Sequence, residues 1–467
     1  MPMFTKLIRN RRWVRPFIIL VIALGLRLYQ LPSRFVFGVD EEYQAYLAQS
    51  IVKNFHLIWI GVGSTADFYL GPLWTYLTAG LLWLSKGTPL ITGYFSVVLG
   101  VTATLAVFLI GKKIFGKRAG LVSMLLYACL PLVVYFDQKY WNVSLVPLLS
   151  LMMFYALTQA VSNRKWLVVF AFLFGLVFHT HLSLVFFGLV ALVWIWISKI
   201  KVNKKTMLGI LVAFLIIYSP LLVFDYYHRW SNLSTPLRLL NDTGKADVSA
   251  GVGPKLYTIG NSLSRLFYLA PYQNSADETN WGCTYSQTKT PIFINLFVGG
   301  LLLLFMFSKK TWSGKSTKLL ALTILTYLLT FLIFPGSVYE YYLTGLFPLF
   351  LFIPGILIER SSNVFRKLSP VIVVIICILG IRTILTAKAD YGLGVKKELV
   401  QEVLDIIGNE PFELKSEGMC HIAEGWRYLF SVYGRKPEKS DTDRMFGWLY
   451  PDEITGKAGT YQVIMQE

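Results

Sequence analysis

Three consecutive carboxylates, Asp40, Glu41 and Glu42, follow the first apolar segment of the chain. A carboxylate beside a bound hydroxyl takes up its proton as the oxygen attacks, so this cluster is suited to general-base catalysis. Asp and Glu are also common in hydrated loops and at helix N-termini, where they interact favourably with the helix dipole. The residues alone leave these alternatives open and make Asp40 the leading candidate for a catalytic group.

Polar residues with aromatic neighbours occur in four later segments, YFDQKYWN, FHTHLS, SLSRLFYLA and PGSVYEYYL. Carboxylates among aromatic rings suit a sugar or a lipid head group, and guanidinium groups match the geometry of phosphate. The same residues also fit an interfacial belt of aromatics, local ion pairs and snorkelling side chains. The candidates for substrate binding are Asp137, Lys139, His181, Arg265, Glu340 and Tyr342.

Metal and cofactor motifs are scarce in this sequence. His179 and His181 lack the i, i+4 spacing of helical zinc sites, and no strong third ligand is near them in sequence. No Gly-rich nucleotide loop, P-loop or HExxH motif occurs. No cofactor is firmly indicated, and a divalent metal is left open, as is a disulfide between Cys283 and Cys420.

The elements that position these residues are predicted to be membrane helices. The chain has 467 residues, of which 55% are hydrophobic, and this balance does not suit a soluble globule. Apolar runs recur near the length of about 20 residues that crosses a bilayer. We predict eleven spans, at 17–31, 89–110, 120–135, 143–160, 166–179, 182–198, 207–224, 291–307, 319–334, 342–358 and 369–386.

Lysine and arginine collect in every second loop between these spans. The clusters are Lys6 to Arg15, Lys112 to Arg118, Arg164 and Lys165, Lys199 to Lys205, Lys309 to Lys318, and Arg360 to Lys367. By the positive-inside rule these loops are cytoplasmic, which places the N-terminus inside and the C-terminus outside. The net charge of +18 is then explained by anionic lipid head groups, and no nucleic-acid partner is expected.

The predicted fold class is an all-α polytopic membrane protein with a small C-terminal α/β unit. The transmembrane domain comprises residues 1–386, with outward loops at 32–88 and 225–290, and the exoplasmic domain comprises residues 387–467. Segments 41–54 and 72–86 are predicted as interfacial helices, because a span at 72–86 would reverse the side of every later loop. In the tail we predict helices at 395–408 and 424–433 and strands at 446–450 and 460–465.

The chain resembles a known family. Asp40-Glu41 after the first span, followed by Gly71-Pro72-Leu73-Trp74, resembles the bacterial branch of the protein O-mannosyltransferase and aminoarabinose transferase family, within the C-type glycosyltransferases. The segments GLVFHTHLS and YEYYLTGLFP are similar to family segments too. The resemblance implies that Asp40 is the catalytic base, that Glu41 supports it, and that Asp137 takes the place of the acid in the next outward loop.

Two departures from the family pattern concern its cations. Many relatives have Lys-Pro-Pro or His-Pro-Pro where this chain has Leu70-Gly71-Pro72, and an arginine common near the second-loop acid is absent. Lys139, Arg265 and His181 are the candidates to replace these charges. Because the family's cations are missing at their usual positions, the identity of the sugar donor stays open.

The function implied by the resemblance is that of an inverting glycosyltransferase of the plasma membrane. It would move a sugar from a polyprenyl-phosphate donor to a hydroxyl or amine of a protein, lipid or glycan at the outer face. The alternatives are a polytopic transporter or lipid flippase, and a polysaccharide polymerase or ligase with a pyrophosphate-linked donor. The sequence lacks the paired, Gly/Pro-broken spans in related halves that point to alternating access.

Overall fold

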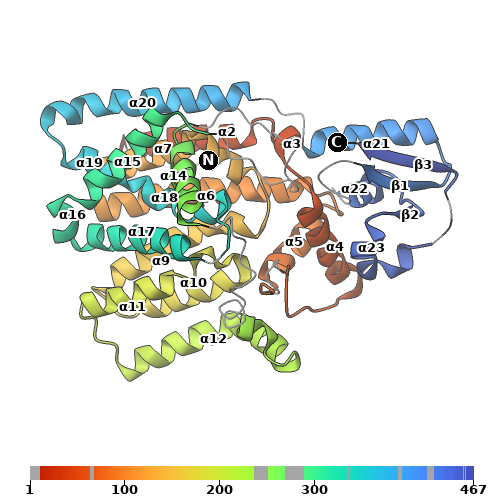
Figure 1. Cartoon of the computed structure of the whole chain (residues 1–467), viewed down its shortest axis with the longest axis horizontal. Helices are drawn as coiled ribbons and strands as arrows, with labels where there is room; N and C mark the ends of the chain where they lie inside the picture. Colours follow the sequence, from red (N-terminus) through yellow and green to blue (C-terminus); the bar gives the residue numbers. More distant parts are fainter. Residues whose placement is uncertain are drawn as a thin grey trace.

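A computed structural model describes residues 11–63, 68–235, 251–268, 289–334, 336–387, 392–417, 425–455, 457 and 459–466. Long apolar helices run side by side and form most of the molecule (Figure 1). The helices of this bundle are α2 (Arg11–Leu28), α6 (Leu90–Phe115), α7 (Lys117–Cys129), α8 (Pro131–Asp137), α9 (Val146–Ala160), α10 (Trp166–Thr180), α11 (Phe187–Ile197), α12 (Lys204–Tyr227), α14 (Val252–Arg265), α15 (Ile292–Met306), α17 (Lys315–Ile333), α18 (Phe347–Phe350), α19 (Phe352–Arg360) and α20 (Asn363–Thr386). Cys283 and Cys420 lie outside the described residues, and so does any disulfide between them.

The bundle has the length and composition of a multi-pass membrane protein. Five helices of the described chain are long and apolar enough to cross a membrane. The number is six if the bent pair α7 and α8 is counted as one span. Four shorter apolar helices accompany them, and each of the eleven predicted spans is helical for most of its length. Only 17% of the apolar window of α12 and 28% of that of α20 is buried, as expected for helices that face lipid. The count of eleven crossings and their direction stay predictions.

The break between α7 and α8 is stabilised by a buried arginine. The two helices meet at 66°. Pro131 has no N–H to donate to the carbonyl of Tyr127, four residues earlier. The guanidinium of Arg27, on α2, donates instead to the carbonyls of Tyr127 and Ala128, each at 3.2 Å. The bend therefore leaves neither carbonyl unsatisfied, which a dry membrane interior requires.

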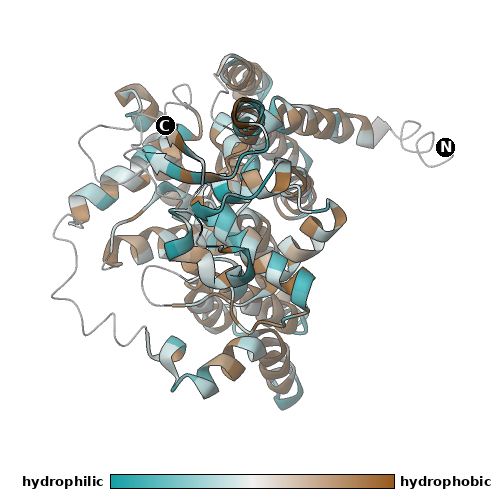
Figure 2. Cartoon of the chain, turned by 90° about the vertical axis from the view of Figure 1, so that its right-hand side faces the viewer, coloured by the Kyte–Doolittle hydropathy of each residue, from teal (hydrophilic) through white to brown (hydrophobic). Residues whose placement is uncertain are grey.

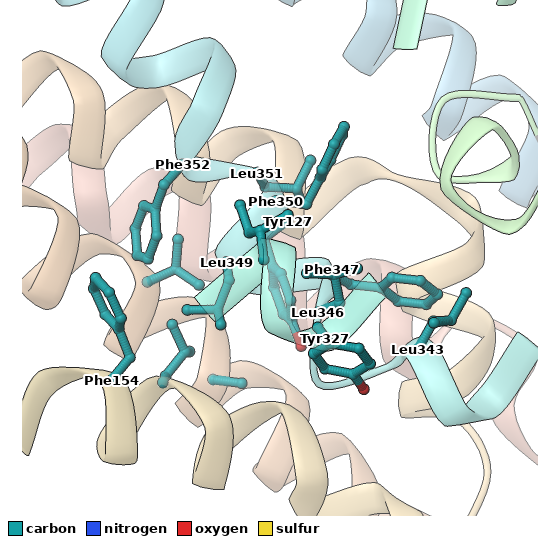
Figure 3. Close-up of a cluster of buried hydrophobic side chains, with 14 of the residues drawn as sticks. Tyr127, Phe154, Tyr327, Leu343, Leu346, Phe347, Leu349, Phe350, Leu351 and Phe352 are labelled. Atoms are coloured by element: carbon teal, nitrogen blue, oxygen red, sulfur yellow. The ribbon is translucent and has the colours of Figure 1, made fainter. Parts of the chain in front are cut away.

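The centre of the bundle is a broken helical segment. The predicted span 342–358 divides into the 3-10 turn η5 (Glu340–Leu343), α18 and α19. Its apolar side chains are almost completely buried, and they pack against Tyr127, Phe154 and Tyr327 from neighbouring helices (Figure 3). This cluster packs α18 against α9 and α17, and the neighbouring η5, which carries one of the predicted sites, contacts α14.

The two ends of the bundle differ in composition. The helices α3 (Leu31–Arg34), α4 (Val39–Asn54) and α5 (Leu73–Leu84) lie at one end with the C-terminal unit, and α16 (Lys309–Ser313) lies at the other (Figure 1). Figure 2 looks onto the first end and shows many hydrophilic residues there, with apolar helices behind. At the other end, three predicted basic loops meet: Arg360 donates to Thr317 at 3.3 Å, and Gly116 lies beside Glu359. These three predicted cytoplasmic loops thus share one side of the molecule.

The C-terminal unit contains a three-stranded parallel sheet in the order β2-β1-β3. Its elements are α21 (Leu393–Ile407), β1 (Phe412–Glu417), α22 (Trp426–Tyr433), β2 (Lys439–Ser440), α23 (Asp443–Phe446) and β3 (Tyr461–Gln466). Both predicted helices and the strand at 460–465 are confirmed. The strand predicted at 446–450 is wrong: α23 and a 3-10 turn occupy it, because so short an apolar run fits either period.

The C-terminal unit shares a hydrophobic core with residues 32–88, the first predicted outward loop. Phe35, Phe37 and Tyr46 from that region are buried together with Tyr428 and Phe430 from the unit. Backbone bonds add to this contact, since Gly392 and Leu393 donate to the carbonyls of Ser33 and Phe35 at 2.9 and 2.8 Å. The predicted domain boundary near residue 387 is therefore crossed by extensive packing.

Candidate active site

The acidic cluster forms the first turn of α4. The N-cap is Gly38, and its N–H donates to Oε2 of Glu41 at 3.0 Å, so Glu41 satisfies one of the unpaired donors at the helix start. Asp40 is exposed, whereas Glu42 is completely buried. Residues two apart are about 200° apart around a helix, so these two carboxylates face opposite ways. The cluster therefore lies at a helix N-terminus, one of the alternatives given for it above, and Asp40 is accessible there.

Lys139 lies close to this turn of α4. Its carbonyl accepts hydrogen bonds from the hydroxyls of Ser96 and Ser144, and its Nζ lies 5.4 Å from the ring centre of Tyr135 and 5.2 Å from that of Trp141. Burial lowers the pKa of Lys139, while Glu41 and Asp40 act to raise it. Burial and Asp40 together raise the pKa of Glu41 to about 7, against the opposing effect of Lys139. The structure therefore brings Asp40, Glu41 and Lys139 within electrostatic reach of one another.

His181 faces an aromatic wall at the same site. Its ring lies 5.6 Å from that of Tyr341 and 5.3 Å from that of Tyr342. Burial lowers the pKa of His181 to about 4, so the imidazole is neutral at physiological pH. Its Nδ1 accepts a hydrogen bond from the N–H of Ser183 at 3.2 Å, which leaves the proton on Nε2. His181 can therefore donate one hydrogen bond to a ligand oxygen.

Trp141 and Tyr341 complete this wall, with ring centres 5.0 Å apart. Asp40 is among the charges that raise the pKa of Tyr341, after burial and the neighbouring tyrosines, so this phenol also lies near the acidic turn. The sequence offered both aromatics as neighbours of predicted residues, but nothing in it showed that they face each other. Their contact links the turn after α8 to η5.

Three of the predicted binding residues are engaged in buried ion pairs. Asp137 accepts from Arg27, with the shortest N–O distance 2.7 Å, and its side chain is 8% exposed. Arg265 pairs with Glu340 at 2.8 Å, with side chains 7% and 4% exposed. These pairs connect α2 to α8 and α14 to η5, so each has a clear structural role.

The first histidine of FHTHLS, His179, has a structural position. Nε2 of His179 donates to the carbonyl of Ile217 at 2.7 Å, and Nδ1 accepts from the N–H of Leu73 at 3.4 Å. A Cβ at Gly71 would lie 2.2 Å from Nδ1 of this ring. The departure from the family pattern at residue 71 therefore has a physical reason, because His179 fills the space that a side chain there would need.

In the described parts of the chain, no three His, Cys, Asp or Glu side chains gather closely enough to hold a metal ion. What the site does offer is an accessible carboxylate, a neighbouring cation, a neutral hydrogen-bond donor and several aromatic faces. A carboxylate can accept a proton, a cation can stabilise developing negative charge, and rings can pack against a sugar.

Comparison with known sequences finds one family model that matches about a third of the chain. The model of the family described as dolichyl-phosphate-mannose-protein mannosyltransferase matches residues 70–224. This stretch runs from the segment before α5 to the end of α12 and includes Asp137, Lys139 and His181. No curated protein matches the sequence significantly.

Solved structures share the fold at low sequence identity. ArnT from Cupriavidus metallidurans bound to undecaprenyl phosphate aligns with a TM-score of 0.57 and 12% identity, over 96% of this chain and 89% of that one. Its apo state gives 0.54 and 12%, over 94% and 88%. The Archaeoglobus fulgidus oligosaccharyltransferase tethered with an acceptor peptide gives 0.50 and 14%, over 92% of this chain but only 64% of that one. The predicted fold class is thereby confirmed.

Proposed function

We propose that this chain, a protein-mannosyltransferase-like member of the C-type glycosyltransferase superfamily, transfers a sugar from a polyprenyl-phosphate donor to an acceptor hydroxyl or amine at the outer face of the membrane. The observation that carries the proposal is the placement of Asp40. It is exposed at the start of α4 and lies within electrostatic reach of Lys139 and of Tyr341 in the aromatic wall. A base in this position can reach a substrate because it is exposed, whereas Asp137 and Glu340 are buried.

A membrane-borne donor fits the place of the site. The acidic turn lies where the apolar bundle ends, so a head group can reach Asp40 while its isoprenoid chain stays among the helices (Figure 1). The related ArnT structure contains undecaprenyl phosphate. This supports a lipid-linked donor here and argues against transport, because the family and the shared fold are those of glycosyltransferases.

The proposed reaction is a single displacement. Asp40 takes the proton from the acceptor hydroxyl as its oxygen forms a bond to the anomeric carbon. The bond from that carbon to the phosphate oxygen breaks through an oxocarbenium-like state, and polyprenyl phosphate leaves with the electron pair. Lys139 and Nε2–H of His181 are placed to stabilise the charge on the leaving phosphate. Attack from the face opposite to the leaving group inverts the anomeric configuration.

The remaining predicted residues have narrower proposed roles. Glu41 caps α4 and keeps Asp40 at its tip, and Tyr342 contributes a ring to the sugar-binding wall. Arg265 and Glu340 hold η5 and its tyrosines in place through their ion pair. Asp137 is still proposed to bind the substrate, by a contact made while it remains paired with Arg27.

The proposal is tested in cells that lack the protein. We expect a polyprenyl monophosphate sugar to accumulate in their lipids, and mass spectrometry of the lipid extract identifies it. The wild-type gene should clear this lipid, whereas Asp40→Asn should lower turnover about 10²- to 10⁴-fold, since general-base catalysis contributes about that much.

A matched control is Glu398→Gln, which changes an exposed carboxylate on α21 far along the chain from the site. It should clear the lipid like the wild type. Clearance by Asp40→Asn at the wild-type rate would refute the catalytic assignment. Accumulation of a pyrophosphate-linked sugar would instead identify a polymerase or ligase.

A further inference from the structure

Glu42 belongs to the acidic cluster, yet the proposed reaction does not use it. Its side chain is completely buried on the face of α4 opposite to Asp40. Its Oε1 accepts a hydrogen bond from the N–H of Tyr428, at 2.8 Å. Tyr428 is the third residue of α22. A carboxyl group from α4 therefore binds the first turn of a helix in the C-terminal unit.

This bond takes the place of a missing N-cap. The residue at the N-cap of α22 is Gly425, with a φ of 83°, and no side chain of its own segment caps the helix. A Cβ at this position would lie 2.6 Å from Cδ1 of Phe37 and 2.8 Å from its carbonyl oxygen. Ser, Asp or Asn, the usual capping residues, therefore cannot be accommodated there. Glu42 supplies the acceptor from across the interface.

The contacts around Glu42 fasten the same face of α4. The ring of Tyr46 lies 4.4 Å from that of Tyr450 and 5.3 Å from that of Tyr428. The residue before Tyr428 in α22, Arg427, is fully buried and pairs with Asp443 at 2.8 Å. It also donates to the hydroxyl of Tyr46 at 3.4 Å. One side of α4 is thus clamped to α22 and α23, while Asp40 occupies the opposite side at its tip.

We propose that Glu42 is a positioning residue for Asp40, because by capping α22 it fixes where the first turn of α4 lies relative to Lys139 and the aromatic wall. This inference rests on the proposed function. The C-terminal unit then acts in catalysis without contacting the substrate. A misplaced general base typically costs rate, and a displacement of about 1 Å can cost about 10²-fold.

The test separates reach from charge at position 42. Glu42→Gln keeps the acceptor oxygen in place and removes the ionisable group. Glu42→Asp keeps the ionisable group but withdraws the oxygen by one methylene, and Glu42→Ala removes both. The donor is the lipid-linked sugar purified from cells lacking the protein, and membranes of those cells supply the acceptor. We expect kcat near the wild-type value for Glu42→Gln and about 10- to 100-fold lower for Glu42→Asp and Glu42→Ala, with KM for the donor changed less than about threefold.

The matched control is Lys53→Gln. It removes the exposed ion pair between Lys53 and Glu453, 3.1 Å long, at the other end of α4 on the same interface. Exposed pairs contribute little, so its kcat should equal that of the wild type. Thermal unfolding in detergent checks that each variant is folded, and Glu42→Asp remains the test if Glu42→Ala does not fold.

Wild-type kcat in folded Glu42→Asp and Glu42→Ala would overturn the inference. So would a loss in Glu42→Gln as large as that in Glu42→Ala, because charge and not reach would then matter. Asp40→Asn is measured in the same preparation. If Asp40→Asn is inactive while the Glu42 variants are fully active, only the positioning role is refuted. If Asp40→Asn is fully active, the proposed function itself is refuted.

Discussion

Two kinds of carboxylate occur near the end of the bundle that carries the C-terminal unit. Asp137 and Glu340 are buried and paired with Arg27 and Arg265 at 2.7 and 2.8 Å. Asp40 is exposed and lies within electrostatic reach of the amine of Lys139. The first kind joins helices that are far apart in sequence, and the second faces an open site.

The difference shows why acid content alone does not identify a catalytic group. A buried carboxylate in a tight ion pair is held by its partner, and removing either member leaves an uncompensated charge. A general base has to meet the substrate and exchange a proton, so it has to be accessible. Of the acids compared, Asp40 meets this condition, and the paired acids support the scaffold around it.

The largest expected effect comes from breaking a buried pair. Arg27→Met leaves Asp137 buried without its partner and frees the carbonyls of Tyr127 and Ala128. We expect a loss of about 3–5 kcal/mol in the free energy of unfolding, measured by equilibrium unfolding in mixed detergent micelles.

The double variant Arg27→Met/Asp137→Leu is the control for this prediction, because it leaves no unpaired charge. It should recover part of the lost stability. A stable double variant that transfers sugar normally would assign Asp137 to the scaffold alone. A stable double variant without transfer would support its predicted contact with substrate.

A smaller effect is expected at Lys139, on the other side of the comparison. Lys139→Gln removes the cation beside Asp40 and should lower kcat/KM for the donor lipid about 10- to 100-fold, the order of one lost transition-state contact. The fold should persist, because glutamine stays polar and the backbone carbonyl that accepts from Ser96 and Ser144 is unchanged. Lys199→Gln changes an exposed lysine in a predicted cytoplasmic loop and should leave transfer unchanged. Equal rates for the two variants would contradict a role for Lys139.

The smallest effect concerns pH. Burial raises the pKa of Glu42 to about 8 from an ordinary value near 4.5. The folded protein therefore favours the protonated form, so stability is highest below the ordinary pKa and falls as pH rises from about 4.5 through 8. We expect the thermal midpoint of the wild type to fall between pH 6 and pH 9, by a few degrees, and that of Glu42→Gln to fall less. Parallel curves for the two proteins would show that Glu42 does not titrate in this range.

The local part of this architecture could be predicted from sequence, because its signals are local. Apolar length predicted the helices, and the turns that carry Asp40, Lys139, His181 and Tyr342 were found by their polar and aromatic residues. The helix at 41–54 was expected to lie in the membrane interface, whereas the structure buries its Tyr46 against the C-terminal unit. Periodicity marks an apolar face but does not tell whether lipid or protein covers it.

The partners of the charged residues could not be predicted. Arg27 and Asp137 are 110 residues apart, and Glu42 and Tyr428 are 386 apart. No local pattern links such positions, and each was consistent with a solvated or lipid-facing charge until the fold placed its partner. The roles of Glu42 and of the two buried pairs are therefore inferences from the three-dimensional structure.

The account depends most directly on the side of the membrane that Asp40 faces. The measurement is labelling of variants that carry one engineered cysteine, by a maleimide that cannot cross membranes. They are made in a chain with Cys283→Ser and Cys420→Ser, in which the two remaining cysteines, Cys129 and Cys377, are buried. Asp40→Cys should react in intact cells, and Lys199→Cys should react only after the cells are permeabilised. Reaction of Asp40→Cys only after permeabilisation would place the acidic turn in the cytosol and contradict glycosyl transfer at the outer face.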